Sequence, residues 1–264
     1  MARIKYIKKG QCIWCLKKEP DVTFYKKPHT ISKQLGATKI GFDICDSCNF
    51  FLGTADKSQK HPMSVELAFK EILNVMRLLL KNDFNENTHK SFKSIYFNYF
   101  HSKNVIHIRN SFKSNPYFLS SLTRQFIKGT YETFLQEYHR VTENALNKEF
   151  DPIRNFVRYD KGNLPLYFME SNGVYLIEED IDNPSFSINE NNISEINDFG
   201  FFMTWLFSNV FFLEVTPRAE IARDVFLKRE SGKLIGSGSI YTALRKMRYI
   251  TDLDFTLRKL HNKI

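Results

Sequence analysis

The sequence predicts an α+β protein in which a small, cysteine-bearing module precedes a larger mixed α+β domain. All four cysteines stand between residues 12 and 48, as two Cys-x-x-Cys pairs. Beyond residue 60, apolar residues recur with helical spacing in some segments and with strand alternation in others. The 264 residues are 42% hydrophobic, which is enough to bury a sizeable core. We therefore expect a module at residues 1–58 and an α+β domain at residues 60–264.

The four cysteines predict a structural zinc site. The basic N-terminal stretch MARIKYIKKGQC has no apolar run of signal-peptide length, which indicates a cytoplasmic protein with reduced thiols. The two sulfurs of each pair lie on one tight turn, so two facing turns form a tetrahedral thiolate set. Redox-active thiols are the alternative. Thiolates would fill all four zinc positions, which leaves none for a catalytic water. The expected ligands are Cys12, Cys15, Cys45 and Cys48.

The residues between and after these pairs resemble the HNH endonucleases of the zinc-stapled type. In that family a first Cys-x-x-Cys is followed by an acidic residue, a His and a Leu-Gly stretch. A second Cys-x-x-Cys then has Asn directly after its last Cys. This chain has "PHTISKQLGA", with His29, and "ICDSCNFFLG", with Asn49. The resemblance is confined to the module, and it implies a zinc-bound ββα-metal fold there.

The resemblance also implies a catalytic site. His29 would stand on a strand of a hairpin as general base, and Asn49 would be a ligand of a catalytic Mg²⁺ or Mn²⁺. The family's acidic ligand is replaced by Pro28, which offers no side-chain oxygen. The alternatives are a surface histidine for His29, a helix N-cap for Asn49, and a capping or turn role for Asp46. The candidate replacement ligands are Asp43, Asp46, Asp56 and His61.

The charge distribution indicates a polyanionic partner for the module. The net charge is +9, and residues 1–60 carry twelve Lys or Arg against five acidic residues. Residues 162–217 carry nine acidic residues and no Lys or Arg, so they are a poor DNA surface. Neutralising phosphates releases counterions, which favours DNA as the partner. The expected phosphate contacts are Lys26, Lys27, Lys33, Lys39, Arg245, Lys246 and Arg248. For Arg245, Lys246 and Arg248, the alternative is a solvated helix face.

Apolar periodicity predicts the elements of the larger domain as far as residue 160. Helical spacing indicates a helix from Val65 to about Lys81 and a longer one from Leu119 to Asn147. Short β-rich runs indicate strands within residues 93–100 and 104–112. Pro152 at a first helical position predicts a further helix over residues 151–160.

Strands are expected to dominate the next part of the chain, within residues 164–170, 174–180 and 184–189. The most apolar stretch, Phe199–Val215, predicts a buried hairpin turning at Ser208-Asn209, with a membrane segment as the alternative. A helix should follow Pro217 over residues 217–230, and the Gly-rich residues 231–239 should be flexible.

Together these features favour a metal-dependent DNA endonuclease or nickase, similar to components of phage-defence or mobile-element systems. The larger domain would then bind substrate, a protein partner or a second copy of the chain. No membrane partner is expected. The alternative is a module that has lost catalysis, as Pro28 would indicate, and that acts as a DNA-binding or complex-assembly protein.

Overall fold

The computed structural model describes residues 3–55, 61–84, 92–103, 105–174, 181–238 and 240–256, and it confirms the α+β class. The helices of these residues are α1 (Asp46–Gly53), α2 (Val65–Phe84), α3 (Pro116–Thr142), α4 (Asp151–Tyr159), α6 (Glu190–Phe199) and α7 (Ala219–Gly236). The strands are β1 (Phe97–Phe100), β2 (Val105–Ile108), β3 (Leu166–Ser171), β4 (Phe201–Leu206), β5 (Asn209–Glu214) and β6 (Tyr241–Lys246).

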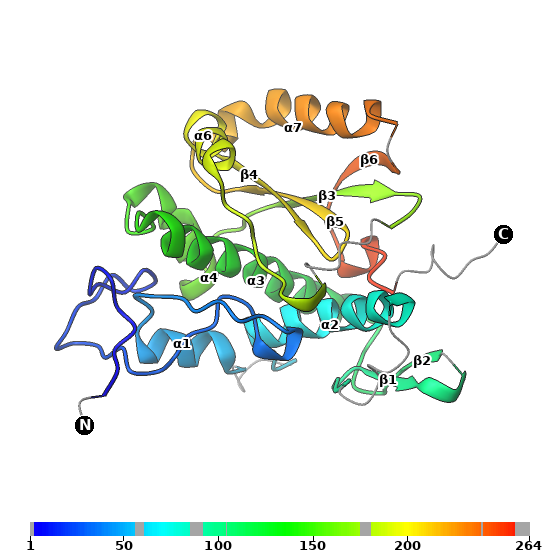
Figure 1. Cartoon of the computed structure of the whole chain (residues 1–264), viewed down its shortest axis with the longest axis horizontal. Helices are drawn as coiled ribbons and strands as arrows, with labels where there is room; N and C mark the ends of the chain where they lie inside the picture. Colours follow the sequence, from blue (N-terminus) through cyan, green and yellow to red (C-terminus); the bar gives the residue numbers. More distant parts are fainter. Residues whose placement is uncertain are drawn as a thin grey trace.

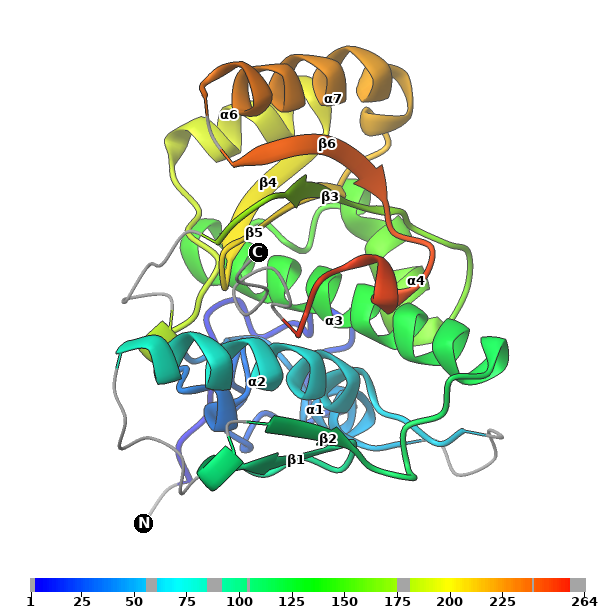
Figure 2. The same cartoon turned by 90° about the vertical axis from the view of Figure 1, so that its right-hand side faces the viewer.

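The elements form layers around α3. A four-stranded antiparallel sheet in the order β4-β5-β3-β6 lies on one side of α3, and α1 and α2 lie on the other (Figures 1 and 2). Helix α7 covers the outer face of the sheet (Figure 1). The pair β1–β2 forms a separate small hairpin beneath α2 (Figure 2). Helix α3 is therefore covered on opposite sides.

The apolar run from Phe199 to Val215 forms the predicted hairpin, because both faces of this sheet are buried. Neighbouring residues of a strand point to opposite faces. Phe201 and Phe212 pack with Phe226 of α7, whereas Phe202 and Phe211 belong to the core on the α3 side. The turn lies at Phe207 and Ser208, one residue earlier than the expected Ser208-Asn209, and both turn residues have positive φ, as a two-residue hairpin turn of type I′ requires.

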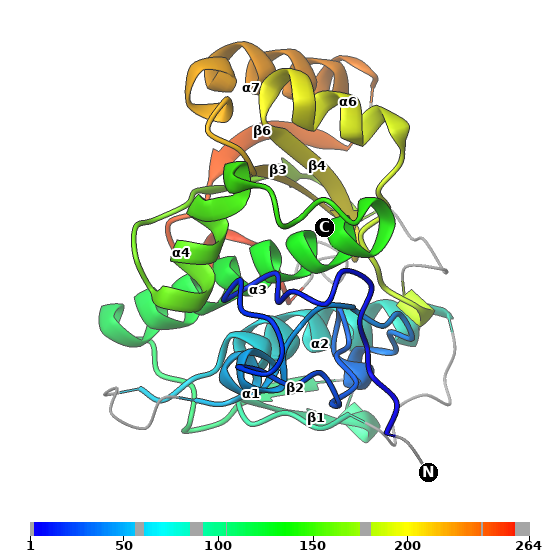
Figure 3. The same cartoon turned by 90° about the vertical axis from the view of Figure 1, so that its left-hand side faces the viewer.

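The N-terminal segment, residues 3–45, packs against α2 and α3 and shares their hydrophobic core. One continuous cluster of buried residues extends from Cys12 to Phe255. Figure 3 shows the N-terminal segment running along α3. The boundary between the two predicted domains falls within residues 56–60, outside the described residues, so the division stays a prediction.

Several elements differ from the sequence expectation. Helix α3 begins at Pro116, where Asn115 caps it, and ends at Thr142 rather than at Asn147. Residues 184–189 form no strand, and the unexpected helix α6 follows them, begun by a capping box at Asn189. Helix α7 continues to Gly236, so the expected flexible stretch is helical over most of its length. Arg245 and Lys246 lie on strand β6 rather than on a helix. The strand expected at residues 174–180 lies outside the described residues, apart from Val174.

The membrane alternative for the apolar run gains no support. Within the described ranges, the chain has no helix that combines the length and the apolar character needed to cross a bilayer.

Candidate functional site

The four cysteines come together as a candidate metal centre. Their sulfur atoms all lie within 4.8 Å of one another, although the two pairs are separated by 29 residues in the sequence. Cys12, Cys45 and Cys48 are buried, and Cys15 is partly exposed. A cluster of four thiols at this spacing can bind a metal ion such as zinc. The coarse prediction of a metal-binding cysteine cluster is thus confirmed.

Local contacts hold the cysteine cluster to the rest of the fold. Cys45 is the N-cap of α1, where its sulfur accepts a hydrogen bond from the backbone N–H of Cys48 at 3.4 Å. Arg158 of α4 donates from Nε to Sγ of Cys48 at 3.4 Å, which places a positive charge beside the thiolate set. Hydrogen bonding to Cys12 lowers the pKa of the Cys15 thiol below its ordinary value. The centre therefore orders the start of α1.

His29 is held on a short antiparallel contact that leads into α1. His29 and Ile40 form an isolated bridge rather than the strand hairpin that the resemblance implies, and a 3₁₀ turn, Lys33–Leu35, lies in the loop between them. The next residue, Thr30, donates a hydrogen bond to buried Glu137 of α3 at 2.5 Å, and Thr133 donates to the Thr30 carbonyl at 3.3 Å. Helix α3 therefore fixes the position of the His29 segment.

The surroundings of His29 favour its neutral form. Partial burial, followed by the positive charges of Lys33 and Lys27, lowers the pKa of the imidazole from its ordinary value of 6.5. At neutral pH the ring is therefore uncharged and able to accept a proton.

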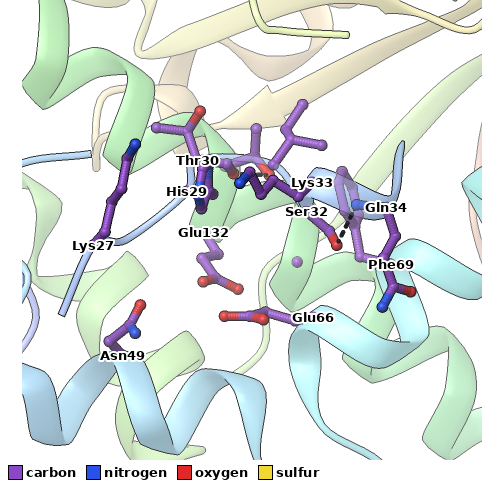
Figure 4. A pocket seen from close by; sticks show the side chains of 13 residues that line it. Lys27, His29, Thr30, Ser32, Lys33, Gln34, Asn49, Glu66, Phe69 and Glu132 are labelled. Atoms are coloured by element: carbon purple, nitrogen blue, oxygen red, sulfur yellow. Dashed lines mark hydrogen bonds between the residues drawn. The ribbon is translucent and has the colours of Figure 1, made fainter. Parts of the chain in front are cut away.

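Asn49 lies in the first turns of α1 and is not its N-cap, because Cys45 occupies that position. Asn49 instead lines a cavity of about 260 Å³, to which His29 also contributes. In Figure 4, the amide of Asn49 points toward the same space as the imidazole of His29. The structure thus brings together the two residues that the sequence singled out as catalytic.

Two carboxylates that the sequence analysis did not identify also line this cavity. Glu66 comes from the first turn of α2, and Glu132 comes from the middle of α3. Their carboxylates lie beside each other below His29 (Figure 4). Burial, reinforced by the charge of Glu66, raises the pKa of Glu132 well above its usual range. Burial also raises the pKa of Glu66. The cavity therefore concentrates oxygen donors of the kind that Mg²⁺ and Mn²⁺ prefer.

The sequence contained only a weak signal for these two carboxylates. Glu66 stands three positions before Phe69 and Glu132 stands three positions before Leu135, and both of those apolar residues are buried. Residues three apart are neighbours on a helix, so each Glu borders an apolar face. The sequence therefore shows that each Glu lies beside an apolar helix face. It does not show that α2 and α3 pack together, which is what brings the two carboxylates into one cavity.

The other expected ligands lie elsewhere. Asp43 is fully buried and accepts hydrogen bonds from His139 and from backbone N–H groups. Asp46 accepts from the Thr23 hydroxyl at 2.6 Å and from the Lys26 backbone at 2.7 Å. The ring of His61 packs edge-on against Phe118 at 5.5 Å, and His61 does not line the cavity. Asp56 lies outside the described residues. Asp43 and Asp46 therefore serve the local fold.

Asp43 fastens the N-terminal segment to α3. Its Oδ2 accepts from His139 Nε2 at 2.9 Å, and both side chains are fully buried. Its oxygens also accept from the backbone N–H groups of Lys8, Lys9 and Gly10. Burial alone would raise the pKa of Asp43, but these hydrogen bonds outweigh it and lower the pKa below its ordinary value of 3.8.

We expect Asp43→Asn to lower the free energy of unfolding by about 3 kcal/mol, because it removes the charged partner of a buried hydrogen-bonded pair. The folded-state pKa of Asp43 is depressed, so its contribution is present above pH 3.8 and is lost as the pH falls through the folded-state value. Urea unfolding from pH 7 to pH 2 should thus show the two proteins converging at acid pH. Glu19→Gln, which removes an exposed ion pair with Lys5, should leave stability unchanged. Equal stability of Asp43→Asn and wild type at pH 7 would contradict the assignment.

The predicted phosphate contacts divide into two groups. Lys27 and Lys33 are exposed and line the cavity. Lys26 is exposed nearby, with its ammonium 5.4 Å from the ring centre of Phe50, and Lys39 donates to the hydroxyl of Ser185. The structure does not bring Arg245, Lys246 and Arg248 to this cavity, because they lie on or directly after β6, on the far side of α3 (Figure 2). Lysines of the N-terminal segment are thus the ones placed at the cavity.

Comparison with known proteins adds no assignment to this site. No protein-family model, no curated protein and no solved structure matches the chain.

Proposed function

We propose that this protein is a metal-dependent endonuclease or nickase that hydrolyses phosphodiester bonds of DNA. The single observation that carries the proposal is the shared cavity of His29 and Asn49. These two residues come from separate segments of the zinc-stapled motif, and each has the side chain that the resemblance requires. Lys27 and Lys33 at the same cavity give it the positive charge that attracts a phosphate.

His29 acts as the general base in this proposal. Its imidazole is neutral at pH 7, because partial burial and the nearby lysines lower its pKa. It takes a proton from a water molecule as that water attacks the scissile phosphate. The hydrogen bonds from the Thr30 hydroxyl to Glu137 of α3 and from Thr133 to the Thr30 carbonyl fix the backbone beside His29 relative to the cavity. Fixed geometry of this kind lowers the barrier to proton transfer.

A divalent cation completes the proposed chemistry. The cavity fits such an ion, because Asn49 offers an amide oxygen and the neighbouring acidic residues offer carboxylates. When bound, Mg²⁺ or Mn²⁺ would polarise the phosphoryl oxygen and stabilise the leaving oxygen. The cysteine centre does not supply this function, since four thiolates leave a zinc ion no open position.

A DNA-binding or assembly protein without cleavage is the second candidate, and Pro28 is the observation that favours it. Pro28 is buried, and it occupies the place of the family's acidic ligand. In that case the zinc-held module would keep its basic surface and bind DNA, while residues 60–264 would bind a protein partner.

A plasmid assay separates the two candidates. We expect purified protein to convert supercoiled plasmid to nicked or linear DNA with Mg²⁺ or Mn²⁺. Mn²⁺ should be more effective, because Mg²⁺ demands near-ideal octahedral geometry and gives up its bound water reluctantly. EDTA should stop the reaction and added Mn²⁺ should restore it, with zinc content measured in the same samples. DNA retained in a gel shift but left intact with both metals would establish the second candidate instead.

A further inference from the structure

We propose that Glu66 and Glu132 are the carboxylate ligands of the divalent cation, so that α1, α2 and α3 build one metal site jointly. This inference rests on the cavity of the proposed function and names the ligands that take the place of Pro28. The site then combines Asn49 of α1, Glu66 of α2 and Glu132 of α3 (Figure 4).

The position of Glu66 relative to α1 supports this arrangement. A Cβ atom added at Gly53, the last residue of α1, would lie 3.2 Å from Oε2 of Glu66. Asn49 stands four residues before Gly53, so the two share one face of α1. The Glu66 carboxylate therefore lies against the face of α1 that carries Asn49, one helical turn from it.

The close packing of α2 on α3 brings the second carboxylate to the same place. A Cβ atom added at Gly129 of α3 would lie only 2.6 Å from Cβ of Phe69 on α2, so glycine permits this approach. Glu66 stands one turn from Phe69, and Glu132 stands one turn from Gly129. All four residues line the cavity or its wall. The helix contact thus sets the separation of the two carboxylates.

The burial of this carboxylate pair favours a bound cation. The side chain of Glu132 is 5% exposed, and within the described residues it accepts a hydrogen bond only from Gln136, at 2.9 Å. Neither carboxylate makes an ion pair with a Lys, Arg or His of the described ranges. Two neighbouring carboxylates in a desolvated site repel each other, and burial penalises each charge. A divalent cation bound between them removes both costs.

The chemistry of the donors selects the class of ion. Two carboxylates and one amide offer only oxygen, which suits Mg²⁺ or Mn²⁺ and not the soft metals that bind thiolates. Mg²⁺ sites commonly use one or two carboxylates and leave the other positions to water and substrate phosphate. Lys27 and Lys33 are exposed and line the same cavity, so their positive charges would attract a phosphate to the ion.

Direct Mn²⁺ binding to the zinc-loaded full chain, followed by electron paramagnetic resonance or calorimetry without DNA, tests this site. We expect Glu66→Gln and Glu132→Gln each to weaken Mn²⁺ binding by about ten-fold or more, and the double variant to abolish it. His29→Ala should leave Mn²⁺ affinity within about two-fold, because the base is not a ligand here. Glu71→Gln is the matched control, since Glu71 is a buried carboxylate of the same helix whose partners are Ser94 and Lys70.

Thermal melting gives an independent readout that also checks folding. In metal-free protein at pH 7, Glu132→Gln should raise Tm, because the raised pKa of Glu132 means that the carboxyl must take up a proton on folding, and the Gln variant has no such cost. The same concentration of Mn²⁺ should raise the Tm of wild type more than that of the variant, because stabilisation by a ligand falls as its affinity falls. Equal Mn²⁺ affinity in wild type and both Gln variants would overturn the ligand assignment.

The two levels of the proposal fail separately. Carboxylate-dependent Mn²⁺ binding in a protein that never cuts DNA would refute the nuclease and retain the metal site. Conversely, full DNA cleavage by the Glu66→Gln/Glu132→Gln double variant would refute the metal site and retain the nuclease.

Discussion

The variant His29→Ala is expected to cleave DNA roughly 10³-fold more slowly than wild type, since a well-placed general base usually contributes a rate factor of about this size. The loss should appear in the chemical step, because the imidazole accepts a proton only in the transition state. Zinc content, Tm and DNA affinity should stay near those of wild type. Single-turnover cleavage of a labelled duplex, together with a gel shift at equal salt, measures both quantities on one substrate.

The pH profile of cleavage adds a second criterion for His29. Its pKa is lowered from 6.5, so wild-type activity should persist below pH 6.5 and then fall as the ring gains a proton. His107→Ala is a suitable control, because His107 is exposed on β2 and does not line the cavity. Wild-type cleavage rates in His29→Ala would rule out this residue as the base.

The variant Cys48→Ser is expected to lose bound zinc and, with it, the folded N-terminal segment. Structural zinc contributes on the order of 10 kcal/mol of folding free energy in small zinc-bound modules, which exceeds the whole stability of many domains. Cys48 lies directly before Asn49, and its sulfur also accepts from Arg158 of α4. Loss of this ligand should therefore disorder α1 and remove Asn49 from the cavity.

Metal analysis and far-UV circular dichroism measure this outcome. Wild type should carry one zinc ion per chain, and Cys48→Ser should carry close to none. Ser47→Ala is the local control, since Ser47 is exposed and contributes only a hydroxyl contact to Cys45 at 3.2 Å. A Cys48→Ser protein that keeps its zinc and its Tm would show that these cysteines do not form a structural metal centre.

Local sequence signals were sufficient for the α+β class and for the cysteine cluster. The two cysteines of each Cys-x-x-Cys pair lie on one turn, so their proximity depends on local sequence and not on the packing of the rest of the chain. The helices α2 and α4 and the hairpin of β4 and β5 also follow from strong local patterns. The role of the cavity and the identity of its bound ion stay predictions.

Longer-range packing explains what the sequence did not indicate. Helix α3 contains Glu132, Gln136 and Glu137, which would mark a solvent face on an ordinary amphipathic helix. These residues are buried because the N-terminal segment covers that side of the helix. No local sequence pattern indicates that another segment will pack over this side of the helix. In α7, the helix runs through Gly232 and Gly236, where added Cβ atoms would meet open space, so neither glycine is required by packing.

The layered position of α3 has a consequence for protein synthesis. The cavity combines residues near position 30 with Gly129, Glu132 and Thr133, so it cannot form until α3 has left the ribosome. Contacts over such sequence separations also form slowly, since a long loop must close first. A nascent chain therefore exposes its cysteines and its N-terminal lysines well before it possesses the complete cavity. Any chemistry of that cavity is thus withheld until translation has passed the middle of the chain.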